Sequence, residues 1–478
     1  KAVVCNERMD VLGAHSVAQA TAHPRPGWAE QDPHAWDSAL APAIEGALIA
    51  AGLQASDVDA IALAGQLDGC VAVDVHGMPL RAALIWQDKR AVDQLARCAP
   101  ARLFELTGQI ADASHMAPKA AWLRAHGVTA ARFHQPVTYL VERLTGAAVI
   151  DPAHASTTML YDLLAGTWSE ELLAAFELDA AMLPTLQPAT AMAGVVTAAG
   201  AKLTGLLAGT PVAVGTGDDF ATPLGAGIVT PGSIVCALGT AEVVGALADV
   251  PVFDIAATRA ASDPWRALAE PMVETHAYPT GDFFIENPGW LSGGAVRWAL
   301  RTFGFASDAE FDHAAAAAPA GADGVTFLPA LAGAMTPVWR SHARGTLHGL
   351  TAAHDRSHIA RAILEGLAFA SRDVAQRLVA LGLPARDVVV LGGGGQSKLW
   401  TQIRADALGL PHVVAARTDT CPVGAAMIAA VAIGGLPDLH AAAALAPAHS
   451  AAVTPQRSLD DAYERYRDLV MRLVTTTA

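Results

Sequence analysis

The stretch Val388–Leu408 constrains the fold more tightly than any other part of the chain. A short apolar strand (Val388–Leu391) runs into four consecutive glycines (Gly392–Gly395), and Ser397 then opens a helix that Gly409 ends. Strands that alternate with helices are typical of α/β architecture. Free amides at a helix N-terminus bind phosphate or adenosine groups, and glycines let a ligand approach the backbone. The spacing fits neither a Rossmann fingerprint nor a Walker A loop. A ligand-binding turn of another kind is predicted, with an ordinary strand–helix turn as the alternative.

A second unit of this kind leads into a pair of carboxylates. Pro211–Gly215 is predicted to be a strand that enters a glycine-rich turn, and Asp218 and Asp219 follow directly before a helix. Ligands of α/β folds sit at such strand ends. Phosphoryl transfer requires an oriented hydroxyl that loses its proton, and a positioned aspartate performs that task. Asp218 is therefore a candidate base, while the alternative is a purely structural turn in which Asp219 caps the helix at Phe220.

Three other turns carry groups suited to a ligand. Gly239-Thr240 joins two apolar strands and could clamp a phosphate through an amide and a hydroxyl, although a plain hairpin is the alternative. The stretches Gly65–Gly69 and Ile85–Arg90 each follow an apolar strand, and the second contains Trp86. Polar groups beside an aromatic ring suit a polyol, which offers several hydroxyls and one apolar face. Solvated surface turns are the alternative interpretation of both stretches.

The bulk composition narrows the class of protein. A chain of 478 residues suits two or three domains, and 53% hydrophobic against 16% charged residues allows a large core. A net charge of −15 disfavours nucleic acid as a partner, because an acidic surface repels phosphate backbones. No apolar run reaches the roughly 18 residues of a membrane-spanning helix. The scattered cysteines indicate a reducing cytoplasm, and the histidines show no metal-ligand spacing.

Several motifs occur in a fixed order along nearly the whole chain. Gly27–Pro33 carries W-x-E-Q-D-P, Ala64–Gly69 carries A-G-Q-L-D-G, Ile85–Arg90 carries I-W-Q-D-K-R, and Gly217–Asp219 carries G-D-D. A further set within Gly345–Gly366 includes G-T-L-H-G-L and R-A-I-L-E-G. Together these motifs resemble those of the FGGY carbohydrate kinase family, and most closely its xylulose kinase branch. An ordered series is far more specific than any one of its members.

The resemblance implies a fold and a reaction. The fold is α/β, with two actin-like, ribonuclease-H-like ATPase domains that close over a central cleft. The expected boundaries are an N-terminal sugar-side domain over 1–229, a C-terminal ATP-side domain over 230–440, and a linker and helix over 441–478. The expected reaction is ATP-dependent phosphorylation of a hydroxyl on a small sugar or sugar alcohol, with xylulose or a related ketopentose or polyol as the acceptor. Mg²⁺ is expected to accompany ATP.

The resemblance also assigns residues, position by position. Asp218 is the expected base that takes the hydroxyl proton, and also an expected magnesium ligand. The residues expected on the sugar side are Leu67, Asp68, Trp86, Asp88 and Asp219. The residues expected on the nucleotide side are Lys1, Gly239, Thr240, Gly293, Arg297, Gly393, Gly394 and Ser397.

The chain departs from the family pattern at two places. The N-terminal D-x-G-T-x-x-x-K motif, whose Asp helps hold magnesium and whose Thr approaches the phosphates, is represented only by Lys1, its last residue. We expect the remainder of that motif upstream of the sequence given. Leu67-Asp68 stands where xylulose kinases carry Met-His. Histidine can donate a hydrogen bond to a sugar oxygen whereas an ionised Asp only accepts, so the preferred sugar hydroxyls should differ.

These departures keep two other functions open. One is a catalytically silent sugar-binding or regulatory protein on the same fold. The other is an actin-class ATPase without a sugar acceptor, which would leave Trp86 and Asp88 without a role. The expected partners are a small sugar and ATP, without nucleic acid or membrane. A homodimer is one possible assembly, and the cytoplasm is the expected location.

Overall fold

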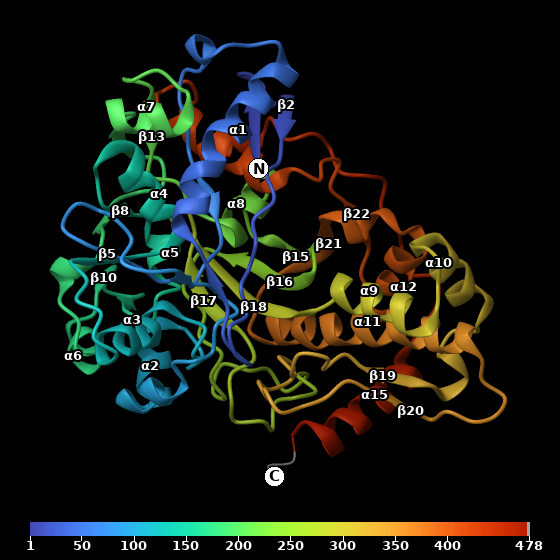
Figure 1. The fold of residues 1–478 in the computed structure, drawn as a ribbon. Helices are drawn as coiled ribbons and strands as arrows, with labels where there is room; N and C mark the ends of the chain where they lie inside the picture. Colours follow the sequence, from blue (N-terminus) through green and yellow to red (C-terminus); the bar gives the residue numbers. More distant parts are fainter. Residues whose placement is uncertain (476–478) are drawn as a thin grey trace. The chain divides into compact units, whose positions relative to one another are not determined.

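The computed structural model describes residues 1–475, and the chain divides into two compact units (Figure 1). The first unit comprises Lys1–Val229, Thr275–Phe283 and Asp419–Ala446. The second comprises Thr230–Glu274, Phe284–Thr418 and the segment from Pro447 onwards. The end of the first long segment coincides with the predicted boundary at 229. The compact units otherwise differ from the predicted domain 230–440 and tail 441–478, because two later segments belong to the first unit and the C-terminal helix belongs to the second.

The strands of the first unit are short and pair mostly in twos. β1 and β2 are antiparallel, β3 pairs with β6, β5 with β7, β12 with β13, and β4 with β14. The strands are β1 (Ala2–Cys5), β2 (Val11–His15), β3 (Glu30–Gln31), β4 (Ala64–Gly65), β5 (Val71–Val73), β6 (Ala83–Leu84), β7 (Arg132–His134), β8 (Val149–Ile150), β9 (Tyr161–Asp162), β10 (Thr167–Trp168), β11 (Thr185–Leu186), β12 (Met192–Val195), β13 (Pro211–Ala213) and β14 (Thr216–Gly217). The helices are α1 (Pro33–Ala51), α2 (Pro100–Thr107), α3 (Met116–Ala125), α4 (Pro136–Thr145), α5 (Pro152–Ala155), α6 (Glu170–Ala175), α7 (Ala198–Thr204), α8 (Asp218–Gly225), α13 (Thr420–Ala432) and α14 (Leu439–Ala443).

Local signals explain where the long helix α1 begins and ends. The side chain of Asp32 caps its N-terminus by accepting a hydrogen bond from the amide of His34 at 3.0 Å, and Pro33 takes the first helical position. Gly52 ends the helix in the left-handed conformation, with a φ of 69° that favours glycine.

Helix α8 is fixed in the first unit by a close crossing with α13. A Cβ placed on Gly225 would lie 1.9 Å from the carbonyl oxygen of Thr420, and one on Gly424 would lie 2.1 Å from that of Ala221. The two glycines therefore let the helix backbones touch. Since α8 begins at Asp218, this crossing sets the position of the predicted base.

The second unit is built on a sheet with helices packed against it (Figure 1). Its strands follow the order β18-β16-β15-β21-β22, in which β15 runs antiparallel to β16 and parallel to β21. The long helix α11 packs against α10, α12 and β19. The elements are β15 (Gly232–Leu238), β16 (Ala241–Ala248), β18 (Phe283–Leu291), α9 (Gly293–Phe303), α10 (Asp308–Ala317), β19 (Thr326–Leu328), β20 (Thr346–His348), α11 (Arg356–Ala380), β21 (Ala385–Leu391), α12 (Lys398–Leu408), β22 (His412–Val414) and α15 (Asp460–Leu473), with β17 (Glu274–Ala277) at the boundary of the two units.

The C-terminal helix α15 is anchored to α11 by a buried polar cluster. The carboxylate of Asp373 accepts hydrogen bonds from the hydroxyl of Tyr463 at 2.7 Å and from the indole of Trp265 at 2.8 Å. Burial raises the pKa of Asp373 to about 6, while these donors lower it.

Among the helices within residues 1–475, none has the length and hydropathy of a membrane-spanning segment.

Candidate active site

Two parallel strands bring the predicted catalytic and sugar-side loops together. β4 and β14 pair in register, with Gly217 beside Gly65. Because the strands are parallel, the loops that follow them leave at the same edge. Asp68 lies in the first loop, and Asp218 and Asp219 begin the helix that follows the second strand. The structure therefore gathers three of the predicted site carboxylates at one edge of the first unit.

Burial and neighbouring charges raise the pKa of Asp218 and of Asp219. Burial is the largest cause of the raised pKa of Asp218, which reaches about 6. Backbone amides of Asp218 and Asp219 lower it, and the charge of Asp68 raises it. Burial, followed by the charges of Asp218 and Asp68, raises the pKa of Asp219 well above its ordinary value. Helix amides thus stabilise the ionised form of Asp218, whereas burial and two neighbouring charges raise the pKa of Asp219.

The helix cap differs from the alternative considered for the sequence. Gly217 is the N-cap of α8, and both aspartates lie in its first turn, so Asp219 is not the capping residue. The backbone amides of Asp218 and Asp219 instead lower the pKa of the Asp218 carboxyl.

Glycine is required in the turn before Asp218. Gly215 has a φ of +78°, and a Cβ on it would lie 2.2 Å from the carbonyl oxygen of Leu63. A Cβ on Gly217 would lie 2.0 Å from a methyl carbon of Leu67. The buried side chain of Leu67 thus rests against the turn that leads to Asp218.

Two buried residues contact the loop that contains Asp68. Asp68 has a φ of +61°, and its Oδ1 lies 3.0 Å from Nδ1 of His115. The Nζ of Lys119 donates hydrogen bonds to the carbonyl oxygens of Asp68 at 2.9 Å, Ile85 at 2.7 Å and Ser114. Burial lowers the pKa of Lys119 to about 8, while the nearby carboxylates raise it. One ammonium therefore joins the two predicted sugar-side loops and supports the unusual backbone of Asp68.

The loop after β6 carries an exposed aromatic ring and a buried carboxylate. Trp86 is 46% exposed, whereas Asp88 is fully buried. Both oxygens of Asp88 accept protein hydrogen bonds, from the amide of Ala29 at 2.7 Å and from the guanidinium of Arg90 at 2.6–2.9 Å. Arg90 also stacks 3.6 Å from the ring centroid of Trp28. Asp88 thus links this loop to the motif at 27–33, and its hydrogen-bond donors are protein groups.

A cavity of about 780 Å³ in the first unit is lined in part by Asp218. Its walls are β1, the inner face of α1, residues 57–65 and α13, and it is lined by both Lys1 and Asp218. The ammonium of Lys1 forms an ion pair with Asp419 just before α13. The predicted nucleotide-side residue Lys1 and the predicted base therefore face one cavity.

The hairpin of the second unit presents an exposed glycine and threonine. Gly239 and Thr240 form the turn between β15 and β16, and both are exposed. The carbonyl of Thr240 accepts the amide of Gly294 at 3.0 Å, and its hydroxyl accepts a hydrogen bond from Arg297 at 2.7 Å. A Cβ on Gly293 would lie 2.4 Å from the carbonyl oxygen of Gly239. Four of the predicted nucleotide-side residues therefore form one cluster at the start of α9.

The glycine-rich turn after β21 lies against the same hairpin. A Cβ on Gly394 would lie 2.7 Å from that of Leu238, the last residue of β15, whereas Gly393 is exposed to open space. Ser397 caps α12 by accepting the amide of Trp400 at 3.0 Å, and it donates to Asp312 at 2.6 Å. Since β15 and β21 are parallel, both turns lie at one edge of the sheet. Exposed amides, a hydroxyl and a guanidinium at that edge suit a phosphate.

A buried ion pair joins the elements around this edge. Arg404 of α12 donates to both oxygens of Glu242 in β16, at 2.6 and 2.5 Å. Glu242 also accepts hydrogen bonds from Ser371 at 2.6 Å and from Ser292 at 2.9 Å, next to α9. All four side chains are fully buried. The pair therefore fixes the hairpin, α9 and α12 relative to one another.

Three buried residues of the candidate site had no signal in the sequence. His115 and Lys119 are distant from Asp68 in sequence, and neither belongs to a recognisable motif. Asp151 accepts a hydrogen bond from the hydroxyl of Thr216 at 2.8 Å, and burial raises its pKa to about 7. In the described residues, no group of three or more His, Cys, Asp or Glu side chains is arranged to hold a metal ion.

Comparison with known proteins agrees with this geometry. Models of the FGGY family of carbohydrate kinases match residues 1–225 with the N-terminal domain and residues 235–433 with the C-terminal domain. A glycerol kinase of Bordetella parapertussis is 34% identical over 435 residues, covering 86% of this chain and 82% of the relative. A xylulose kinase of Escherichia coli K12 is 30% identical over 445 residues, covering 90% and 87%. A solved structure of a "xyloylose kinase" from Brucella ovis has a TM-score of 0.86 and 28% identity, covering 98% of this chain and 96% of that one.

The two family models and the structural match identify a carbohydrate kinase of the actin-like ATPase fold. The chain belongs to the FGGY family of carbohydrate kinases. The predictions of the family and of the fold class are thereby confirmed. The curated relatives include kinases of two different acceptors, glycerol and xylulose.

Proposed function

We propose that this kinase transfers a phosphoryl group from ATP to a hydroxyl of a small sugar or sugar alcohol. Xylulose or a related ketopentose or polyol is the first candidate acceptor, and glycerol is the comparison that the relatives suggest. The observation that carries the proposal is the gathering of Asp68, Asp218 and Asp219 at the adjacent ends of β4 and β14. A set of carboxylates at one strand edge can bind several hydroxyls and deprotonate one of them.

The three carboxylates are proposed to have different roles. With a pKa of about 6, Asp218 is mostly ionised at neutral pH and can accept the proton of the attacking hydroxyl. The pKa of Asp219 is raised well above its ordinary value, and in its protonated form this carboxyl can donate a hydrogen bond to a second sugar oxygen. Asp68 can accept one from a third hydroxyl, and the exposed ring of Trp86 offers an apolar face. We assign Asp88 to positioning, because both its oxygens already accept protein hydrogen bonds.

ATP is proposed to bind through the clustered turns of the second unit. The exposed Gly239, Thr240, Arg297 and Gly393 offer amides, a hydroxyl and a guanidinium to the phosphates, with Gly294 and Ser397 holding the turns in place. Mg²⁺ prefers one or two carboxylates plus phosphate oxygens, and Asp218 fits the role of such a carboxylate. When bound, Mg²⁺ would neutralise charge on the transferred phosphate.

A coupled assay of ADP release tests the proposal. The full chain is screened with xylulose, other ketopentoses, pentitols, tetritols, sugar acids and glycerol at saturating ATP and Mg²⁺. At least one polyol should stimulate ADP release, and Asp218→Asn should lower kcat by about 10²–10⁴ while ATP binding persists. Near wild-type turnover in Asp218→Asn would exclude the proposed base. Sugar binding without stimulated ADP release would instead favour the silent sugar-binding protein.

A further inference from the structure

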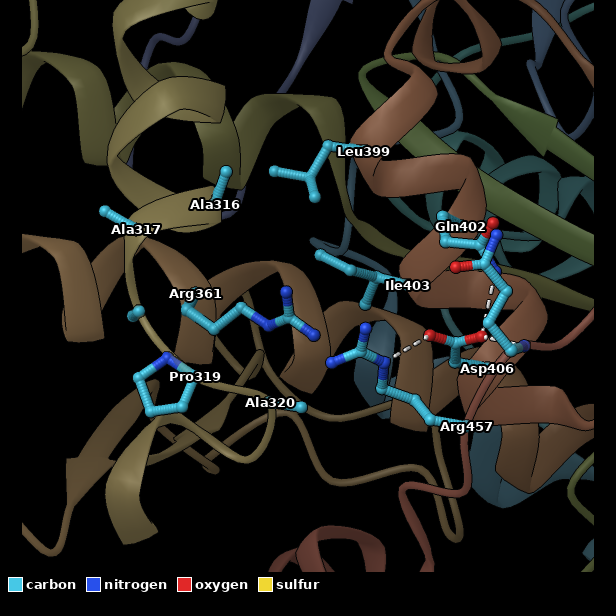
Figure 2. Close-up of a pocket in the computed structure, with 12 residues that line it drawn as sticks. Ala316, Ala317, Pro319, Ala320, Arg361, Leu399, Gln402, Ile403, Asp406 and Arg457 are labelled. Carbon is cyan, nitrogen blue, oxygen red and sulfur yellow. Dashed lines mark hydrogen bonds and ion pairs between the residues drawn. The ribbon is translucent and has the colours of Figure 1, made fainter.

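A cavity outside the candidate active site lies within the second unit. Its volume is about 520 Å³, which is in the usual range of small-molecule sites. Figure 2 shows its walls, which come from the C-terminal end of α10 and the residues after it, from α11, from one face of α12, and from the segment before α15. None of its lining residues is assigned to the sugar or the nucleotide above.

One wall carries a buried guanidinium with incomplete hydrogen bonding. Arg361 is 6% exposed, and Figure 2 shows its guanidinium pointing into the cavity. Its Nε donates to Oε1 of Glu365 at 2.6 Å, and the amide of Gly321 donates to the same oxygen at 2.9 Å. Within residues 1–475, the terminal nitrogens Nη1 and Nη2 of Arg361 donate no hydrogen bond to a protein acceptor. These nitrogens face the cavity and can donate to an acceptor there, and a hydrogen bond from a guanidinium to an anion is stronger than one to a neutral group.

A second guanidinium faces the first across the cavity. The Nε of Arg457 lies 3.7 Å from Oδ2 of Asp406, which is too long for a hydrogen bond, and the side chain is more than half exposed. Oδ1 of Asp406 is already occupied, since it accepts hydrogen bonds from the side-chain amide of Gln402 and the backbone amide of Gln456, both at 2.8 Å. The two arginines therefore offer donors to the cavity, while one oxygen of each neighbouring carboxylate is already bound by protein donors (Figure 2).

The remaining wall is apolar and small. Ala316, Ala317, Pro319, Leu399 and Ile403 line the cavity around the Arg361 side chain (Figure 2). A ligand that fills this space needs a compact anionic group at one end and a carbon body at the other. Guanidinium groups bind phosphate through paired hydrogen bonds, and two of them can hold a dianion.

We propose that this cavity binds a small organic phosphate monoester, with its phosphate between Arg361 and Arg457 and its carbon body against the alanine-lined wall. The site is separate from that proposed for ATP, because the nucleotide-side residues Thr240, Arg297 and Gly393 do not line it. Arg361 and Glu365 belong to the motif R-A-I-L-E-G, which has no part in the proposed phosphoryl transfer. The cavity gives Arg361 of that motif a function.

Isothermal titration of the full chain with phenyl phosphate tests this site. The titration is run with a saturating non-hydrolysable ATP analogue and Mg²⁺, so that the nucleotide site is filled. Phenyl phosphate should bind at one site, and Arg457→Met should weaken binding by at least about tenfold, since a charge-assisted pair is lost. Arg361→Met should do the same, and Arg361→Lys should also weaken binding because the planar fork is lost. Arg356→Met, an exposed arginine on the same helix that pairs with Glu310, should leave binding unchanged.

Several results would overturn the assignment. They are the absence of binding by the wild-type chain in the presence of the ATP analogue, equal binding by Arg457→Met, or equally tight binding of phenol. Arg457 is exposed, so its substitution should not prevent folding, and unchanged thermal unfolding of that variant verifies this. Inorganic phosphate should bind more weakly than phenyl phosphate, because it leaves the apolar wall uncovered. Equal affinity for the two would contradict the role of that wall.

Discussion

Acidification should titrate the proposed base, and the size of the effect follows from the surroundings of Asp218. Burial raises its pKa to about 6, the nearby helix amides lower it, and the charge of Asp68 raises it. A general base acts only in its ionised form. With a pKa of about 6, roughly nine-tenths of Asp218 is ionised at pH 7 and roughly one-tenth at pH 5. We therefore expect kcat/KM to fall about tenfold between pH 7 and pH 5, approaching one decade per pH unit below pH 6.

The measurement is a pH profile of ADP release at constant ionic strength, with circular dichroism at each pH to verify folding. Asp68→Asn supplies an informative control, because removal of its charge should lower the pKa of Asp218 and shift the profile towards lower pH. Asp218→Asn should retain only a small, pH-independent rate. A flat wild-type profile from pH 7 to pH 5 would refute the reasoning, as would an acid limb that persists in Asp218→Asn.

Three further substitutions test the supports of the site. Burial raises the pKa of Asp151 to about 7 in the folded chain, so its contribution to stability falls as the pH rises from about 4 to 7. Asp151→Asn should therefore raise Tm at pH 8 and not at pH 4. Lys119→Met should cost about 3–5 kcal/mol in urea unfolding, because three buried carbonyls lose their donor. Gly424→Ala should cost about 1–3 kcal/mol in urea unfolding and lower kcat, since its Cβ would press on Ala221 and displace α8.

Each of these three predictions has an outcome that contradicts it. An Asp151→Asn variant with the same Tm difference at both pH values would show that the buried carboxyl does not titrate as inferred. Wild-type stability of Lys119→Met would mean that the loop carbonyls find other donors. Unchanged stability and kcat in Gly424→Ala would mean that the crossing of α8 and α13 adjusts without moving Asp218.

The local parts of the fold could be predicted from the sequence. The strand, glycine turn and helix of Val388–Leu408 appear as β21, a short 3-10 turn and α12, with Ser397 as the cap. Gly239-Thr240 is the tip of a hairpin, which was one of its two interpretations. Such features depend on backbone conformations and caps that neighbouring residues determine. The alternative in which Asp219 caps α8 is wrong, since the helix begins at Asp218 with Gly217 as its N-cap.

Contacts between distant segments could not be predicted in this way. The pairing of β4 with β14 joins residues about 150 positions apart, and strands of two residues carry almost no periodic signal. The family resemblance indicated this contact indirectly, because it assigned both segments to one site. No such motif contains Lys119. A lone lysine in a helix is usually solvated, and only the structure shows that this one donates to three carbonyl oxygens.

The departure at Asp68 shows how structure changes a conclusion drawn from residue type alone. The sequence argument compared an accepting Asp with a donating His and inferred a different set of sugar hydroxyls. In the structure Asp68 lies 3.0 Å from the ring of His115, so carboxylate and imidazole form a pair beside Asp218 and Asp219. The charge on Asp68 raises the pKa of both neighbours, and a histidine at that position would not. Residue 68 therefore affects the protonation of the proposed base as well as the hydrogen bonds open to a sugar.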